Sequence, residues 1–243
     1  MPFLVKNFKD FRKEKQIEKS EEELKVRQEY IQKEKEYLMG RFDPSKRDGF
    51  VLVAKEHSSN PYAMHLREET YQAYINMHNA AKEDGIEIKI SSGARNFDSQ
   101  KYLWDEKWKT LKNTGGQAKF RKILEYMAVP GASRHHWGTD IDINGANPEY
   151  FDTVKGKKEY KWLRENASRF GFCQTYDIKN SSRPLGYNEE KWHWSYLPLA
   201  RFFTKEYAKI VTIKDIEGFL GAEYAESFNV IKNYALSINS DCI

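Results

Sequence analysis

Apolar residues are sparse in the first forty positions of the chain, and some of them follow a regular spacing. Four recur at a seven-residue interval, at Ile17, Leu24, Ile31 and Leu38. This interval places them along one stripe of a helix. A coiled coil needs a second apolar residue in each heptad, and this position is polar here, so the coiled-coil seam is incomplete. Residues 6–39 are dominated by Lys, Glu, Gln and Arg and contain no Pro or Gly. We predict one long solvated helix that ends near Gly40 and lies on the domain, with a spacer or docking arm as the alternative.

Beyond this helix the pattern becomes that of a globular domain. Residues 66–84 have apolar positions at helical spacing and are followed by Gly85, a residue typical of helix ends. Residues 86–92 alternate apolar and polar side chains, as a half-buried strand does. A helix is expected to begin near Asp98 and to break at residues 113–116, and another runs from there to about Met127. Further helices are expected over Lys157–Arg169 and over about 214–237. Further strands are expected at 137–143, 171–176 and 191–197.

Helices and strands alternate without a βαβ rhythm, which predicts an α+β fold. We expect a small antiparallel sheet flanked by helices, with the long charged helix at the N-terminus. Residues 1–40 are assigned to a charged helical extension. Residues 41–243 are assigned to one domain that ends in a C-terminal helix.

Composition and charge exclude several classes of protein. Aromatic residues make up 14% of the chain, which is too many for wholesale disorder. No apolar run approaches the roughly 20 residues of a membrane-spanning helix, and the N-terminus lacks the apolar stretch of a secretory signal. The net charge is only +4, and acidic residues are interspersed among the basic ones, which argues against nucleic-acid binding. Two cysteines are too few for a disulfide scaffold or a four-cysteine metal site.

The candidate chemistry is concentrated in two short segments. The chain has six histidines, and three of them lie in SRHHWGTDID at 133–142 or in WHW at 192–194. Two imidazoles and a carboxylate form a common catalytic zinc set that leaves the fourth position for water. Glu190, three residues before His193, is spaced to lie beside such a metal. Asp140 and Asp142 face the same side of a strand, so alternation alone does not choose the carboxylate ligand.

Each of these signals also has a purely structural interpretation. A histidine beside aromatic residues is more often packed in a core than bound to a metal, and the two aspartates can cap turns at the end of a strand. Ser133, His135 and Asp142 also suggest a serine hydrolase. The nucleophile elbow, however, needs Gly at the position of His135, so the hydrolase interpretation is set aside.

Together the motifs resemble a known family. The pattern Ser-x-His-x-x-Gly-x-x-x-Asp followed by Glu-x-Trp-His is similar to that of the VanY-type zinc D-alanyl-D-alanine carboxypeptidases, which are M15 peptidases with a LAS-type fold. The similarity runs from about residue 85 to 200. It includes Ser92-Gly-Ala-Arg95 with Gln100, and the segment 162–172 between the two ligand motifs.

The resemblance implies one Zn²⁺ per chain, held by His135, Asp142 and His193. The chain departs from the family at Asp140, where the family usually has Ala. If Asp140 faced the metal, it would compete as a ligand or weaken the Lewis acidity of the zinc with its negative charge. Asp142 is preferred because it has the family's seven-residue spacing from His135. The tryptophans at 137, 192 and 194 are interpreted as a hydrophobic wall that orients the ligands.

The resemblance also implies catalytic and substrate-binding roles. Glu190 would be the general base, and Arg95 would stabilise the oxyanion that forms at the scissile carbonyl. Ser133 would be a substrate-binding hydroxyl, and Gln100 a supporting polar contact. His136 has two interpretations. It either supports the metal ligands or faces the substrate, or it is a structural residue that packs against the neighbouring tryptophan.

The activity implied by the resemblance is removal of the terminal D-alanine from peptidoglycan stem peptides. A related L,D-carboxypeptidase, a peptidoglycan endopeptidase and a non-catalytic zinc-containing binding module are the alternatives. Glu190 and Arg95 argue against the last one, since a pure binder needs neither. An interaction protein that works through the charged helix is a further possibility. The sequence leaves the oligomeric state open.

The implied substrate lies outside the cytoplasmic membrane, so the resemblance implies a location in the cell envelope or periplasm. In that oxidising compartment Cys173 and Cys242 would pair and tie the C-terminal tail to the domain. The alternative is a buried thiol and a free thiol in the tail.

Overall fold

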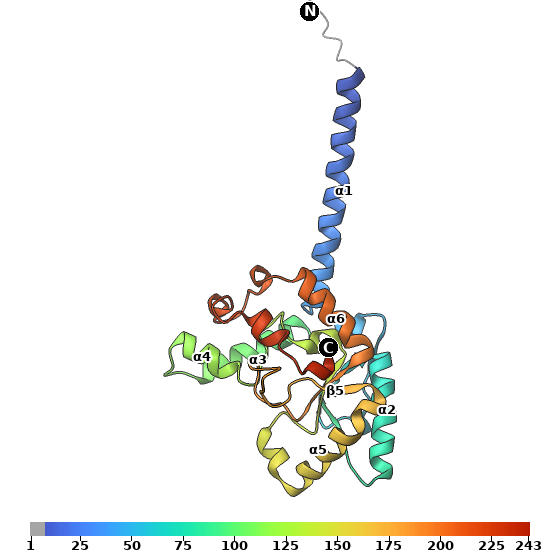
Figure 1. Cartoon of the computed structure of the whole chain (residues 1–243), viewed down its shortest axis with the longest axis vertical. Helices are drawn as coiled ribbons and strands as arrows, with labels where there is room; N and C mark the ends of the chain where they lie inside the picture. Colours follow the sequence, from blue (N-terminus) through green and yellow to red (C-terminus); the bar gives the residue numbers. More distant parts are fainter. Residues whose placement is uncertain (1–7) are drawn as a thin grey trace, which may run out of the picture.

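The structure of the protein is a computed structural model that describes residues 8–243, with side chains described from residue 21 onward. Helix α1 (Phe8–Leu38) stands away from the rest of the molecule (Figure 1). All side chains from 21 to 30 are exposed, and Leu24 keeps 56% of its surface exposed. Ile17 lies outside the residues whose side chains are described. The long solvated helix is therefore confirmed. It projects from the domain instead of lying on it, because its apolar stripe is too narrow to cover a core.

The C-terminal part of α1 contacts the domain, and its end is buried there. Leu38 and Met39 are 2% and 3% exposed and belong to one of the two hydrophobic cores. Lys35 forms an ion pair of 2.9 Å with Asp215. Gly40 follows the helix with a φ of 75°, a backbone angle that favours glycine. The predicted boundary at residue 40 stays a prediction, and the residues just before it contribute to the core of the domain.

A four-stranded antiparallel sheet with the order β3-β4-β6-β5 lies at the centre of the domain. Its strands are β3 (Ile90–Ser92), β4 (Asp140–Ile143), β5 (Phe172–Gln174) and β6 (His193–Tyr196). A separate antiparallel pair is formed by β1 (Phe50–Leu52) and β2 (His65–Arg67). The predicted α+β fold with a small antiparallel sheet is confirmed.

Helices flank the sheet (Figure 1). They are α2 (Glu68–Glu83), α3 (Phe97–Thr110), α4 (Gly116–Ile123), α5 (Val154–Asn166) and α6 (Leu197–Ile210). In α2 the buried residues recur every three or four positions, at Thr70, Tyr74, Met77 and Ala81. This spacing puts them on one face of the helix. Among residues 8–243, no helix is both long enough and apolar enough to cross a bilayer.

Side-chain alternation gives the sheet one apolar and one polar face. On one side, β4 and β6 contribute Ile141, Ile143 and Trp194 to a hydrophobic core shared with α2 and α5. On the other side, the same strands carry Asp140, Asp142, His193 and Ser195. These four side chains are at most 3% exposed. The sheet therefore presents a buried row of polar groups, and a row of this kind requires partners.

Some predicted elements have other bounds or another form. The strand expected at 137–143 begins only at Asp140, because Arg134–Trp137 form a 3₁₀ turn closed by Gly138 with a φ of 69°. The helix expected over 214–237 is instead a series of short turns, because Gly218 and Gly221 have positive φ and interrupt it. The end of the strand expected at 191–197 is the start of α6, which the sequence analysis did not predict.

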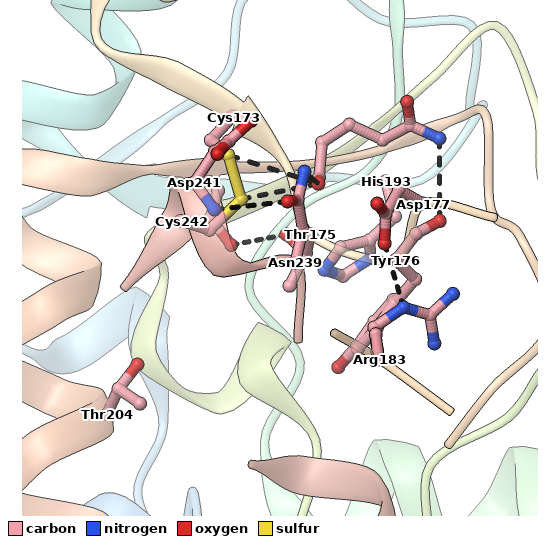
Figure 2. The surroundings of a disulfide bond; sticks show 12 residues. Cys173, Thr175, Tyr176, Asp177, Arg183, His193, Thr204, Asn239, Asp241 and Cys242 are labelled. Atoms are coloured by element: carbon pink, nitrogen blue, oxygen red, sulfur yellow. Dashed lines mark hydrogen bonds and ion pairs between the residues drawn. A yellow bond between two sulfur atoms is a disulfide. The ribbon is translucent and has the colours of Figure 1, made fainter. Parts of the chain in front are cut away.

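A disulfide joins Cys173 on β5 to Cys242, with 5.7 Å between the two Cα atoms (Figure 2). Asn239 adds two hydrogen bonds to the same strand. Its backbone N–H donates to Thr175 O at 2.9 Å, and its Nδ2 donates to Gln174 O at 3.1 Å. The expected pairing is present, and it fixes the end of the chain to the edge strand beside β6.

Candidate metal centre

Strand register brings two of the predicted ligands together. In the antiparallel pair of β4 and β6, Asp142 lies directly opposite His193. Directly opposed residues point to the same face of a sheet, with their Cβ atoms about 5 Å apart. His193 Nδ1 lies 3.1 Å from Asp142 Oδ1. Two residues that are 51 positions apart in the sequence thus form one pair of metal-binding groups.

The third predicted ligand comes from the turn that leads into β4. His135 lies in the 3₁₀ turn Arg134–Trp137, and Gly138 ends this turn in the left-handed region. A Cβ at Gly138 would meet the ring of Phe50 at 2.4 Å, so glycine is needed for its backbone angle and for space. The turn aims His135 Nε2 at Asp142 Oδ2, 3.3 Å away.

The three side chains form a compact, buried donor set. His135, Asp142 and His193 each offer one ligand atom, and these atoms lie within 4.8 Å of one another. His135 Nδ1 donates a hydrogen bond of 2.9 Å to Gly93 O, so its Nε2 keeps a free lone pair. Burial alone would raise the pKa of Asp142, but the two histidines hold it well below its usual range. Two imidazoles and an ionised carboxylate in this arrangement fit a zinc ion.

Glu190 lies close to this donor set. Its side chain is buried, and Oε2 is 3.8 Å from His193 Nδ1. Burial raises the pKa of the Glu190 carboxyl to about 8, although His193 acts in the opposite direction. A carboxyl group with a pKa near neutrality is suited to take up and release a proton.

Arg95 reaches the same place from the loop after β3. Its backbone is held by a hydrogen bond from its own N–H to His135 O, at 3.1 Å. Its Nε is buried and has no hydrogen-bond partner among the described residues. A buried guanidinium N–H without a partner is costly unless a ligand satisfies it. Arg95 is therefore available to a bound molecule.

A cavity of about 430 Å³ brings the predicted site residues together. All seven lie in its wall: Arg95, Gln100, Ser133, His135, Asp142, Glu190 and His193. Gln100 Nε2 donates to Ala128 O at 2.7 Å, whereas its Oε1 has no partner among the described residues. Ser133 is buried. The expected substrate contacts thus lie at the cavity, and their roles stay predictions.

Two tyrosines of the cavity wall were not predicted. Tyr176 lies with its ring centroid 4.9 Å from that of His193, and Tyr187 lies 4.9 Å from Tyr176. Both are buried, and no partner of the Tyr187 hydroxyl is found among the described residues. Neither residue belongs to a motif with fixed spacing, so the sequence carries no local signal for them.

The three tryptophans have separate places. Trp192 lines the cavity. Trp137 is in the core beside α6, where its Nε1 donates to Leu38 O at 3.0 Å. Trp194 lies on the apolar face of the sheet. The predicted hydrophobic wall around the ligands is therefore wrong for Trp137 and Trp194.

His136 is a structural bridge. It is 1% exposed, and both ring nitrogens are used by the backbone. Nδ1 donates to Arg95 O at 2.7 Å, and Nε2 accepts from the Gly131 N–H at 3.0 Å. Burial lowers the pKa of His136 to about 3, which keeps the ring neutral. His136 thus fixes the loop that carries Arg95 and does not face the cavity.

Asp140 is outside the donor set. Its Oδ1 lies 3.1 Å from His193 Nε2, on the opposite side of the imidazole from Asp142. Burial alone would lower the pKa of His193, but the two aspartates raise this pKa to about 9. Arg134 Nε donates to Asp140 Oδ1 at 2.9 Å. The choice of Asp142 as the carboxylate of the donor set agrees with this geometry.

Comparison with known proteins gives a consistent result. The family model VanY, described as D-alanyl-D-alanine carboxypeptidase, matches residues 63–199. A D-alanyl-D-alanine carboxypeptidase of Enterococcus faecalis is 32% identical over 148 residues, which are 60% of this chain and 52% of the relative. The putative carboxypeptidase YodJ of Bacillus subtilis is 31% identical over 183 residues, which are 74% of this chain and 61% of the relative. The chain thus spans between half and two thirds of these relatives.

Solved structures are also similar. The LD-carboxypeptidase LdcB superposes with a TM-score of 0.51 at 25% identity, over 71% of this chain and 81% of that chain. A mutant of the vancomycin resistance D,D-pentapeptidase VanY in complex with Zn(II) gives a TM-score of 0.49 at 29% identity, over 74% of this chain and 92% of that chain.

Proposed function

Because the chain belongs to the VanY family of D-alanyl-D-alanine carboxypeptidases, we propose that it removes the terminal D-alanine from peptidoglycan stem peptides with the help of one zinc ion. The observation that carries this proposal is the donor set of His135, Asp142 and His193, whose ligand atoms converge within 4.8 Å in the wall of a cavity. When bound there, zinc would lower the pKa of a water molecule and polarise the scissile carbonyl.

The protein groups around the donor set supply the rest of the chemistry. Glu190 lies beside the donor set, with Oε2 3.8 Å from His193 Nδ1, and would accept the proton of the attacking water at a carboxylate oxygen. The same carboxyl then protonates the leaving amine. Arg95 donates a hydrogen bond to the oxyanion that develops on the carbonyl. Gln100 Oε1, which has no partner among the described residues, and the Ser133 hydroxyl would bind polar groups of the peptide.

A second candidate is an L,D-carboxypeptidase that acts on the stem tetrapeptide. The similarity to LdcB, which is named an LD-carboxypeptidase, favours keeping it. Both reactions use the same donor set and differ in which residue occupies the cavity next to the scissile bond. We further propose that the protein acts in the cell envelope, because its substrate is there and because the disulfide suits an oxidising compartment.

Mass spectrometry of stem peptides tests this proposal. The protein is incubated with a pentapeptide that ends in D-Ala-D-Ala and, separately, with the matching tetrapeptide, with zinc and with a chelator. Loss of one alanine from the pentapeptide alone, abolished by the chelator, supports the D,D-carboxypeptidase. Loss from the tetrapeptide alone supports the L,D-carboxypeptidase. If neither peptide is cleaved by zinc-loaded protein, both proposals are rejected.

A further inference from the structure

The imidazole of His193 lies between two aspartates of the same strand. Asp140 and Asp142 are two residues apart on β4 and point to the same face. His193 Nδ1 is 3.1 Å from Asp142 Oδ1, and Nε2 is 3.1 Å from Asp140 Oδ1. The two carboxylates therefore contact the two ring nitrogens from opposite sides. Of the two aspartates, Asp142 also contacts His135, with 3.3 Å between Oδ2 and Nε2, and it belongs to the donor set.

We infer that Asp140 is a positioning residue that sets which nitrogen of His193 is free to bind the metal. An ionised carboxylate only accepts hydrogen bonds, so its partner Nε2 must carry a proton. A neutral imidazole has one proton, and the lone pair is then on Nδ1, the nitrogen that lies beside Asp142 of the donor set. On metal binding, a ring that carries both protons would release the one on Nδ1 to solvent and keep the one on Nε2. This inference rests on the proposed metal site.

If Asp140 were absent, the single proton of a neutral His193 ring would sit on the other nitrogen. Asp142 is also an acceptor and contacts Nδ1 directly. Without Asp140, the carboxylates beside the His193 ring would be Asp142 and Glu190, and both lie next to Nδ1. They would favour the proton on Nδ1, where it blocks the position of the metal. Asp140 thus favours the tautomer that can bind, which is the role that carboxylates behind metal-bound histidines have in general.

Asp140 is itself held rigidly and its charge is balanced. Arg134 Nε donates to Oδ1 at 2.9 Å, and Thr139 Oγ1 donates to Oδ2 at 2.6 Å. The Ser195 hydroxyl also donates to Oδ1. Arg134 is 2% exposed, and its Nη1 donates to Thr204 Oγ1 at 2.8 Å. The guanidinium compensates the negative charge, so Asp140 can accept a hydrogen bond from His193 Nε2 without adding net charge beside the proposed metal.

Zinc affinity of Asp140 variants tests this role. Asp140→Ala removes the acceptor and should weaken zinc binding roughly 10- to 100-fold, measured by competition with a chromophoric chelator. Asp140→Asn keeps an oxygen acceptor of the same shape and should recover most of this loss. Thr204→Val is the matched control, because it removes only the hydrogen bond to Arg134 Nη1 and leaves the Nε bond to Asp140 in place, so its zinc affinity should be unchanged. A folded Asp140→Ala protein with the affinity of the unmodified chain would overturn the inference.

The unmodified protein provides a test that does not depend on the folding of variants. Long-range ¹H–¹⁵N NMR of the zinc-loaded protein, with labelled histidines, reports the protonation of each ring nitrogen. We expect His193 to carry its proton on Nε2 and to bind zinc through Nδ1. Zinc bound through Nε2 overturns this inference and leaves the proposed function in place. A protein that binds no zinc overturns both.

Discussion

Glu190 is distinguished from the candidate ligands by its distance and its environment. Its Oε2 is 3.8 Å from His193 Nδ1, and burial raises its pKa to about 8. Glu190→Gln keeps the shape of the side chain but removes the proton acceptor. We expect turnover to fall by at least about 100-fold, while the zinc content measured by mass spectrometry stays at the level of the unmodified protein. Unchanged turnover would refute the general-base role.

Arg95 offers a second test at a single residue. Its buried Nε has no partner among the described residues, whereas its backbone carbonyl is occupied by His136. Arg95→Met should leave the loop in place and remove the donor to the oxyanion. We expect kcat to fall roughly 10²- to 10³-fold, with a smaller change in KM. An effect on KM alone would show that Arg95 binds the ground state of the substrate and does not stabilise the transition state.

At the scale of residues, the motifs predict part of the cavity wall. The seven predicted residues belong to sequence motifs with fixed spacing, and the structure brings them to one cavity. The sequence could not choose between Asp140 and Asp142 from alternation, because the choice depends on the cross-strand partner of each. The register places Asp142 opposite His193 and Asp140 opposite Ser195, which favours Asp142 as the ligand. Tyr176 and Tyr187 reach the cavity through tertiary packing, which leaves no pattern in the sequence.

The turn before β4 shows how an element positions a ligand. Gly138 has a φ of 69°, and a Cβ there would meet the ring of Phe50 at 2.4 Å. Gly49 has a φ of 79° with open space around it, so it is a matched control. Gly49→Ala should cost about 1 kcal/mol of unfolding free energy from backbone strain alone. Gly138→Ala should cost about 3 kcal/mol, because overpacking adds to the strain.

Urea denaturation measures both variants. We further expect Gly138→Ala to weaken zinc binding, because a displaced turn would move His135 relative to Asp142. Equal losses of stability for the two variants would show that Phe50 moves aside without cost. Zinc affinity that is unchanged would show that the turn tolerates the shift.

The disulfide between Cys173 and Cys242 closes a loop with a sequence separation of 69. A cross-link over a loop of this size restricts the unfolded chain and is worth about 4 kcal/mol. Replacing both cysteines by Ala should lower the unfolding free energy by about this amount, measured by urea denaturation without reductant. Reductant should destabilise the unmodified protein and leave the double variant unchanged. A double variant as stable as the unmodified protein would show that the bond is dispensable.

At the scale of elements, the prediction was most accurate where periodicity was strong. The amphipathic helix expected at 66–84 is α2 (Glu68–Glu83). The stretch 214–237 has a helical composition, but positive φ angles at Gly218, Gly221 and Asn229 divide it into short turns. The antiparallel sheet was expected as a class, whereas its strand order was not, because pairing depends on contacts between distant segments.

The whole molecule consists of a compact domain and a projecting helix, and the boundary between them can be tested by truncation. Removing residues 1–30 deletes only exposed parts of α1 among the described side chains, and we expect it to change the unfolding free energy by less than about 0.5 kcal/mol. Removing residues 1–40 also deletes Leu38 and Met39, which are buried in the core. This longer truncation should cost at least about 3 kcal/mol.

Thermal unfolding and peptide cleavage should be measured on both truncated chains. Cleavage that survives the shorter truncation would make the arm a spacer or a docking device. Cleavage that is lost with the shorter truncation, without loss of stability, would instead assign the arm a part in catalysis.

The pairing of β4 with β6 also determines when the proposed metal site can form as the chain folds. Asp142 and His193 are 51 residues apart, and a ribosome adds about 5 to 20 residues per second. For several seconds a nascent chain therefore has two of the proposed ligands and lacks the third. Zinc can be held in full only after β6 has emerged and paired with β4. Full binding of the metal would then require a correctly paired sheet, and the proposed hydrolytic activity would begin only in molecules in which β4 and β6 have paired.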